Sequence, residues 1–452
     1  MNILLLNPPG NEFVRAGSRW PHRRKLLTKR GLYFPFPFAL AYAGARLKQA
    51  GHTVAIKDCP VLQWDITALL QFISSFSPGL IIMETSAPSF SADMDTVKQL
   101  KGTPLCAAGF HATALPRQHL DAGFDYVFCG EYEYLIADFV ESLEGKSALP
   151  PYVGTVANPA PVYAPILDNL DLLPYPLRDE LPLKQYHDPF SRGFNITLLS
   201  SKGCTHACSF CSLAPYIGKT KYRTRNVAQV VDEMLYLVKR YHPSEILFDD
   251  DTLTVQPAHL IALCREICER VRGISWSCMG NVPVSEECAT WMAKAGCRAI
   301  KLGVESGIQS ILDTIPKGIT LKQIKETFAT LRRHRIKRHA TIMIGLPGDT
   351  KKTVMETVKF VLSLNPDTVQ FSTATPYPGT VFYKIAQKNG WLVNNSYEEF
   401  NGAGTTPLSY PEFSKHEIES SYRKGLRMWH RFMLLHKPQT ILHHLKNYLS
   451  SR

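Results

Sequence analysis

The sequence lacks several features that define common protein classes. No apolar run reaches the roughly 18 residues that cross a bilayer as a helix, so we expect no membrane span. The first nine residues have no basic segment and no small-residue cleavage site, so we expect no secretion signal. Internal repeats are absent as well. There is no Gly-x-Gly-x-x-Gly fingerprint, which argues against a dinucleotide cofactor.

Acidic residues are the minority among the charged side chains. The chain has 51 Lys and Arg against 39 Asp and Glu, a net charge of +12. This excess suits phosphates, carboxylates, nucleic acid or an anionic membrane face, and it does not choose among them. The 11 cysteines are odd in number and accompany no export signal. Reduced thiols or metal ligands are therefore favoured over a disulfide framework.

The length of 452 residues and a hydrophobic content of 45% predict two or three globular domains. Residues 1–145 alternate short apolar runs with helical patterns, which predicts a doubly wound, Rossmann-like parallel sheet of the α/β class. Residues 146–190 are rich in proline and predict a linker. Residues 191–385 predict a second β/α block, and residues 386–452 predict a mainly helical region. The expected strands are 3–6, 53–57, 80–84, 105–108, 126–129, 196–199, 245–248, 275–277, 299–303, 341–344 and 368–372.

Three cysteines form a closely spaced group directly after an expected strand. Cys204, Cys208 and Cys211 have the spacing C-x3-C-x2-C, which scattered cysteines would seldom produce by chance. A structural zinc site is one interpretation, with His206 as a fourth ligand, although no partner CxxC lies nearby. Three thiolates on one tight loop better suit a [4Fe–4S] cluster that keeps one iron free of protein ligands.

This loop, at the start of a β/α block, resembles the radical S-adenosylmethionine (SAM) superfamily. The resemblance implies that the cluster binds SAM at its open iron, with Phe210 packing near the adenine. Phe248-Asp249-Asp250-Asp251 ends the next expected strand, where the family places contacts to the SAM amino group, so Asp249 and Asp250 are candidate SAM ligands. Glu305, in Gly-Val-Glu-Ser-Gly, matches an acidic residue that meets the SAM ribose. The implied fold is a partial (β/α)6 barrel of the TIM type, with its site at the carboxyl ends of the strands.

The domain before this block resembles the cobalamin-binding branch of the same superfamily. The matching segments follow expected strands, and they implicate cobalamin contacts by Asn7, Pro8, Pro9, Thr85, Ser86, Gly109, His111, Gly130 and Glu131. A distinctive stretch around Arg19 and Trp20 is expected to lie over the corrin and the substrate. The Asp-x-His-x-x-Gly motif, whose His coordinates cobalt in other corrinoid proteins, is absent. The loop after the second strand reads Asp58-Cys59-Pro60 in its place.

Plainer interpretations stand beside these. Thr85 and Ser86 could cap the following helix, and His111 could belong to the core. Glu131 could stabilise a helix N-terminus, and the Arg19 stretch could be a solvated basic loop. Cys264 and Cys268, four apart on an expected helix, suit a core helix better than a metal site.

The resemblance implies an oxygen-sensitive cytoplasmic enzyme that uses a [4Fe–4S] cluster, SAM, cobalamin and an external one-electron reductant. The expected reaction is methyl transfer to an unactivated carbon of a small natural product, lipid or pigment. Cyclisation, rearrangement or oxygen insertion without methyl transfer is the alternative within the family. A non-catalytic corrinoid or iron–sulfur binding protein is the alternative outside it.

The stretch 422–449 mixes basic, aromatic and aliphatic residues. Such a helix can lie on an anionic membrane, which would place the protein peripherally at the inner membrane face, or it can pack on its own protein with its charges in solvent. No nucleic-acid-binding module is visible, so we expect no nucleic-acid partner.

Overall fold

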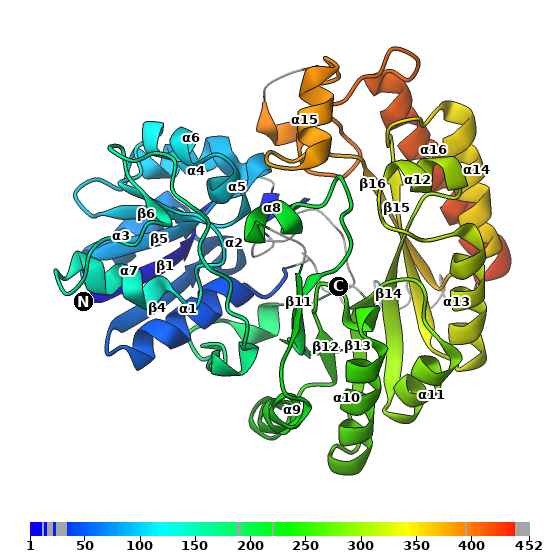
Figure 1. Ribbon diagram of the computed structural model, residues 1–452, viewed down its shortest axis with the longest axis horizontal. Helices are drawn as coiled ribbons and strands as arrows, with labels where there is room; N and C mark the ends of the chain where they lie inside the picture. The colour runs from blue at the N-terminus through cyan, green and yellow to red at the C-terminus, as the bar shows by residue number, and fades with distance from the viewer. Residues whose placement is uncertain are drawn as a thin grey trace.

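The computed structural model describes residues 1–10, 34–186, 188, 190–191, 193–218, 221–393 and 396–438, and in addition the backbone of the short strands β2 (Phe13–Arg15) and β3 (Pro21–Arg23). The described chain holds two six-stranded sheets, each flanked by helices (Figure 1). No helix among these residues is both long and apolar enough to cross a membrane.

The first sheet has the strand order β4-β1-β5-β6-β7-β8. Its first five strands are parallel, and β8 joins β7 in the antiparallel sense. These strands are β1 (Asn2–Asn7), β4 (Thr53–Asp58), β5 (Leu80–Glu84), β6 (Leu105–Ala108), β7 (Tyr126–Phe128) and β8 (Val153–Gly154). The alternation of apolar runs and helical patterns predicted the five parallel strands. The two-residue β8 comes from the proline-rich stretch expected to be a linker.

Helices cover both faces of this sheet because the strands are apolar on both sides. Side chains of α1 and α7 pack on one face, and those of α3, α4 and α6 pack on the other. The helices of this part are α1 (Phe38–Gln49), α2 (Cys59–Leu62), α3 (Ile66–Phe76), α4 (Phe90–Val97), α5 (Phe110–Ala114), α6 (Pro116–Asp121) and α7 (Ile136–Leu143). Helix α4 begins directly after a short helical turn at residues 87–89.

The second sheet is all parallel, in the order β16-β15-β14-β13-β12-β9. Its strands follow one another around an open, partial barrel. They are β9 (Asn195–Leu198), β12 (Glu245–Phe248), β13 (Ser275–Gly280), β14 (Cys297–Glu305), β15 (Lys337–Ile344) and β16 (Thr368–Thr373). All six were expected from the sequence, and the α/β class with this architecture is confirmed.

Helices line the outside of the barrel, and the described chain ends on a longer helix. The helices of this part of the chain are α8 (Leu213–Ile217), α9 (Val227–Tyr241), α10 (Pro257–Arg270), α11 (Glu286–Lys294), α12 (Gln309–Thr314), α13 (Leu321–Arg333), α14 (Lys351–Ser363), α15 (Val381–Lys388) and α16 (Lys415–His436). Side-chain caps fix several of their starts. Thr320 and Gln323 form a capping box on α13, and Ser414 and Glu417 form another on α16.

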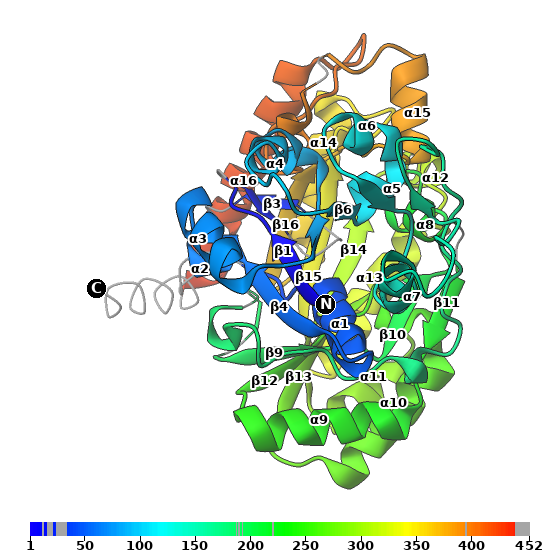
Figure 2. The same ribbon diagram turned by 90° about the vertical axis from the view of Figure 1, so that its left-hand side faces the viewer.

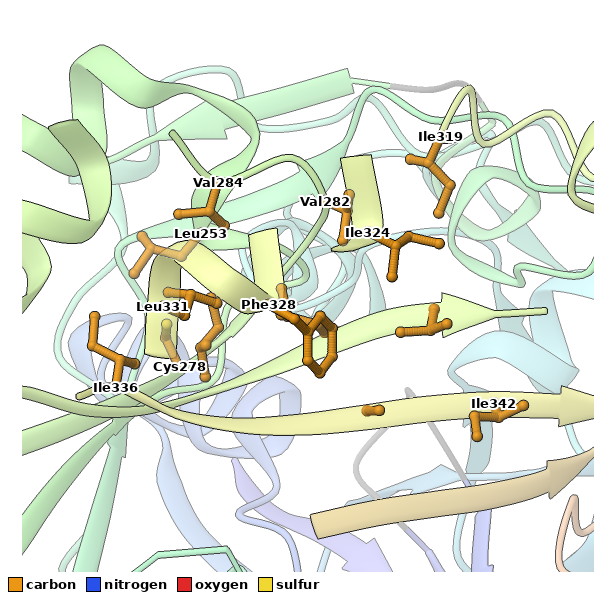
Figure 3. Close-up of a cluster of buried hydrophobic side chains, with 14 of the residues drawn as sticks. Leu253, Cys278, Val282, Val284, Ile319, Ile324, Phe328, Leu331, Ile336 and Ile342 are labelled. Carbon is orange, nitrogen blue, oxygen red and sulfur yellow. The ribbon is translucent and has the colours of Figure 1, made fainter. Parts of the chain in front are cut away.

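The barrel core lies between the strands and these outer helices. In Figure 3, Phe328 of α13 reaches toward the strands, and Ile324 and Leu331 flank it on the same helix. These side chains are at most 1% exposed, as is Ile342 on β15. The outward face of each strand is therefore sealed by helix. The inward face and the strand ends remain for a binding site.

Candidate active site

The cysteine loop is held by a β-hairpin that the sequence pattern did not predict. Cys204 ends β10 (Ser201–Cys204), which pairs antiparallel with β11 (Lys221–Thr224). Gly203 has φ +95°, and a Cβ there would lie 1.8 Å from the Lys221 carbonyl oxygen. Only glycine allows this close approach, so the residue beside the first cysteine is fixed by backbone geometry.

Cys208 and Cys211 follow in the turn before α8, where the Cys211 amide donates to the Cys208 carbonyl at 3.1 Å. All three thiols are partly buried. Burial raises the pKa of Cys208 and of Cys211 to about 12, so each holds its proton until a metal displaces it. Within the described residues, no three His, Cys, Asp or Glu side chains converge on a point where one ion would bind. Three spaced thiols on one loop fit a multi-iron cluster better than a single zinc ion.

The acidic residues after β12 support this loop. Asp250 is fully buried and accepts hydrogen bonds from the amide and hydroxyl of Ser200 and from the hydroxyl of Ser201. Asp251 accepts from the Gly203 amide at 2.7 Å. Both carboxylates therefore hold the segment that leads into Cys204. Of the residues predicted to contact SAM, Asp250 has this supporting position.

Asp249 and Phe210 lie in different surroundings. Asp249 lines a cavity described below. Phe210 is 7% exposed and belongs to the hydrophobic core of the barrel. The ring therefore anchors the cysteine loop to the core.

Glu305 ends β14 with a left-handed backbone (φ +62°) and is buried beside Lys317. The Lys317 ammonium donates to the Glu305 carboxylate at 2.6 Å and to the Gly303 carbonyl at 2.8 Å. A Cβ on Gly303 would lie 2.3 Å from both charged groups, so this pair requires glycine there. Lys317 also acts electrostatically on Cys204 and Cys208. Sequence reasoning missed Lys317, whose only signal was a lysine in a Pro-Lys-Gly turn.

The carboxyl edge of the first sheet presents two buried polar side chains without partners. Asn7 is completely buried at the end of β1, beside Pro8 and Pro9. His111 is 3% exposed at the start of α5, and its ring packs against Phe90, His119 and Tyr397. Among the described residues, neither the Asn7 amide nor either His111 ring nitrogen finds a hydrogen-bond partner. Burial lowers the pKa of His111 well below its usual value, so the ring is neutral.

The neighbouring candidates are occupied by local contacts. Thr85 shares a hydrogen bond of 2.9 Å with His119, and Ser86 shares one of 2.7 Å with Ser89. Gly109 and Gly130 both have positive φ, +97° and +106°. They turn the chain sharply out of the sheet toward the second domain. Arg19 and Trp20 lie outside the described residues.

Glu131 joins the carboxyl edge of the first sheet to the hairpin of β10 and β11. Its carboxylate receives two hydrogen bonds of 2.7 Å from Arg223 on β11, and Lys202 on β10 lies 3.1 Å away. Burial alone would raise the pKa of Glu131, but Lys202 and Arg223 outweigh it and hold the value at about 2. Lys202 also pairs with Glu133. The loop predicted to touch cobalamin is thus joined by ion pairs to the hairpin that carries Cys204.

Further contacts join the same two edges. Phe110 of α5 stacks on Tyr216 of α8 with ring centroids 4.1 Å apart, and the two helices lie in contact. The carboxyl edge of the first sheet therefore faces the cysteine segment. Figure 1 shows α5 next to α8, and Figure 2 shows the molecule from the side of the first sheet.

A cavity lies where this arrangement meets the inner face of the barrel. It is lined by aromatic and polar side chains from both halves, among them Phe34, Phe36, Tyr186, Asn195, Thr197 and Asp249.

Residues 198–361 match the model of the radical SAM superfamily. The matched segment contains the cysteine loop and Glu305.

Over most of its length the chain is similar to two curated proteins. An uncharacterized methyltransferase of Pyrococcus horikoshii is 28% identical, over 94% of this chain and 91% of the relative. The anaerobic magnesium-protoporphyrin IX monomethyl ester cyclase of Rubrivivax gelatinosus is 26% identical, over 83% and 70%.

Among solved structures, the radical SAM methyltransferase TsrM from Kitasatospora setae has the same fold, with a TM-score of 0.67 and 19% identity over 86% of this chain and 77% of that one. That protein has been solved with tryptophan and a SAM analogue, and with cobalamin and a [4Fe–4S] cluster.

Proposed function

We propose that this protein is a cobalamin-dependent radical SAM enzyme that transfers a methyl group to an unactivated carbon of a small molecule. The observation that carries the proposal is the meeting of two strand edges. One bears the cysteine loop with Glu305 and Lys317, and the other bears Asn7 and His111, which have no hydrogen-bond partner among the described residues. The similarity to two methyltransferases over most of the chain supports the choice of reaction.

On the barrel side, Cys204, Cys208 and Cys211 hold the [4Fe–4S] cluster, and Asp250 and Asp251 keep their loop in place. Asp249 and Glu305 bind polar groups of SAM, and Phe210 fixes the loop to the core. Lys317 orients the Glu305 carboxylate and compensates its charge in a buried site.

On the side of the first sheet, Asn7 and His111 supply hydrogen bonds to cobalamin, whose amide side chains can both donate and accept. Buried amide and imidazole groups are costly without partners, which favours a ligand there. Thr85, Ser86, Gly109, Gly130, Pro8 and Pro9 shape the same edge, with Arg19 and Trp20 as proposed covers. Glu131 acts through Arg223 and Lys202, by fixing this edge against the cysteine hairpin.

The chemistry that the bound cofactors supply is hydrogen abstraction from carbon by a 5′-deoxyadenosyl radical, followed by delivery of a methyl group. The chain's own residues position the cofactors on either side of the cavity. Phe34, Phe36 and Tyr186 exclude water from it, which protects a carbon radical from side reactions.

Anaerobic reconstitution with iron, sulfide and hydroxocobalamin tests the proposal. We expect about four irons per chain and an equimolar amount of cobalt. Incubation with SAM and a reductant should then give both 5′-deoxyadenosine and S-adenosylhomocysteine.

Iron without cobalt would overturn the cobalamin assignment. Cobalt and 5′-deoxyadenosine without S-adenosylhomocysteine, across a substrate screen, would favour a cyclase or rearrangement instead. Retention of zinc without iron would overturn the radical SAM activity itself.

A further inference from the structure

Two basic segments, far apart in the sequence, meet at the amino-terminal edge of the barrel. One is the turn between α13 and β15, with Arg332, Arg335 and Lys337 exposed. The other is the end of α16, where the Lys437 ammonium donates to the Pro366 carbonyl just before β16. We call Arg332, Arg335, Lys337 and Lys437 the basal basic edge.

Electrostatics shows that these groups are close enough to influence one another. Burial lowers the pKa of Lys437, Asp367 opposes this, and Arg338, Arg332 and Lys337 lower it further. The acidic side chains at this edge are already engaged, because Asp367 pairs with Arg338 and Glu286 pairs with Arg333. The edge therefore presents a net positive surface.

Helix α16 extends this surface. From Ser420 to Pro438 the chain has five basic residues and no Asp or Glu; the basic residues are Arg423, Lys424, Arg427, Arg431 and Lys437. Its inner face packs on the barrel through Ile418, Gly425, Trp429 and Met433. On the outer face of the last turn, Leu434 is 60% exposed and Leu435 is 67% exposed. Among the described residues, these two adjacent leucines have no packing role.

We propose that this surface docks the protein on an anionic lipid bilayer, with the basal basic edge and the last turns of α16 facing the headgroups and Leu434 and Leu435 inserted among them. Basic residues near an anionic membrane each add modest attraction, and exposed aliphatic side chains add insertion. A nucleic acid would contact the basic residues through its phosphates and would not require the leucines. The presence of both basic residues and exposed leucines therefore favours lipid.

The geometry also fixes the orientation. The basal basic edge lies where β15 and β16 begin, whereas the cysteine loop and Glu305 lie at the carboxyl ends of the strands. Docking through this edge would hold the cysteine loop and Glu305 on the side away from the bilayer. The surface thus recruits the enzyme to a membrane without feeding a lipid directly into its site.

Co-sedimentation of the full-length, reconstituted protein with vesicles tests this. We expect binding to phosphatidylcholine vesicles that contain phosphatidylglycerol, little binding to phosphatidylcholine alone, and release at high salt. Arg332→Gln with Arg335→Gln should weaken binding about tenfold at low salt. Leu434→Ser with Leu435→Ser should weaken it by a similar factor of about ten, at low and moderate salt alike.

Matched controls separate this surface from general stickiness. Val156 and Val162 are 66% and 58% exposed on the proline-rich stretch, so Val156→Ser with Val162→Ser removes equal apolar exposure elsewhere. Lys98→Gln with Lys101→Gln removes two exposed charges from the first domain. Both controls should bind as the wild type does, and unchanged thermal unfolding should show that every variant folds.

Three results would overturn the proposal. The first is equal binding to neutral and anionic vesicles. The second is equal loss in the control variants. The third is tight binding of a mixed-sequence RNA duplex that displaces the vesicles and persists in the leucine variant, which would identify a nucleic-acid surface.

Discussion

The carboxyl edges of the two sheets differ in how completely the chain itself supplies partners for their buried polar side chains. At the barrel edge, the charged side chains are satisfied by the chain itself, as in the pairing of Glu305 with Lys317 and of Asp250 with two serines. At the edge of the first sheet, Asn7 and His111 are buried without partners among the described residues. Where the chain pairs its own charged side chains, the loop that they support is held in place before a ligand binds. Buried polar groups without partners lower the stability of the ligand-free protein, and a ligand that pairs with them can restore it.

The largest expected effect comes from a substitution in the cysteine loop at the barrel edge. Cys208→Ser should remove the cluster and lower formation of 5′-deoxyadenosine by about a thousandfold or more, because the cofactors carry the chemistry. Iron content and product analysis measure this. Cys268→Ser changes an exposed cysteine on α10 and should keep full iron and activity. Equal loss in both variants would remove the cysteine loop from its proposed role.

Next comes the ion pair at the end of β14. Lys317→Met leaves a buried carboxylate without its partner and should cost about 4 kcal/mol in the free energy of unfolding of the reconstituted protein. The KM for SAM should also rise. The double variant with Glu305→Gln should recover part of the stability but not the KM. If the single and double variants both unfolded like the wild type in urea, the pair of Lys317 and Glu305 would not stabilise the barrel edge.

The ion pair between the two edges gives a pH dependence. The pKa of Glu131 is lowered from 4.5 to about 2 in the folded protein, so its contribution to stability is present above pH 4.5 and is lost as the pH falls toward 2. The contribution is about 3 kcal/mol. Acid titration of the unfolding free energy should therefore be flatter in Glu131→Gln than in the wild type. Parallel curves would contradict the assignment.

The smallest expected effect is that of a substitution at Asn7, and it tests the difference between the two sheet edges most directly. Asn7→Leu replaces a buried, unpartnered amide by an apolar group of similar size, so the cobalamin-free protein should be about 1 kcal/mol more stable or unchanged. Its affinity for hydroxocobalamin, followed by absorbance, should fall about tenfold.

A matched change on the barrel provides the control for Asn7. Asn281 is also buried, but its amide oxygen accepts from the Val282 amide at 3.0 Å. Asn281→Leu should therefore destabilise the protein and leave cobalamin binding unchanged. If Asn7→Leu instead destabilised the cobalamin-free protein as much as Asn281→Leu does, the edge of the first sheet would not be waiting for a ligand.

Much of the fold was readable from the sequence because its signals are local. Continuous apolar runs such as residues 80–83 suit strands that are buried on both faces, as in a parallel sheet covered by helices. The cysteine loop was readable for the same reason, since its spacing brings three thiols onto one turn whatever the rest of the chain does. The hairpin of β10 and β11 has no such local signal in the sequence. It depends on the close approach of Gly203 to the Lys221 carbonyl, which lies on the other strand.

By itself, the sequence determined the two sheets, their order along the chain and the cysteine triad. Only the tertiary structure decided which polar residues pair with their neighbours and which are buried without a partner among the described residues. Asp250 and Glu131 were both read as ligand contacts, yet one holds the cysteine segment and the other joins the two domains. Lys317 and the basal basic edge came from contacts between residues 12 to about 100 positions apart. The physical reason is that a charge acts through space on whatever the fold brings near it, and periodicity along the chain does not record that distance.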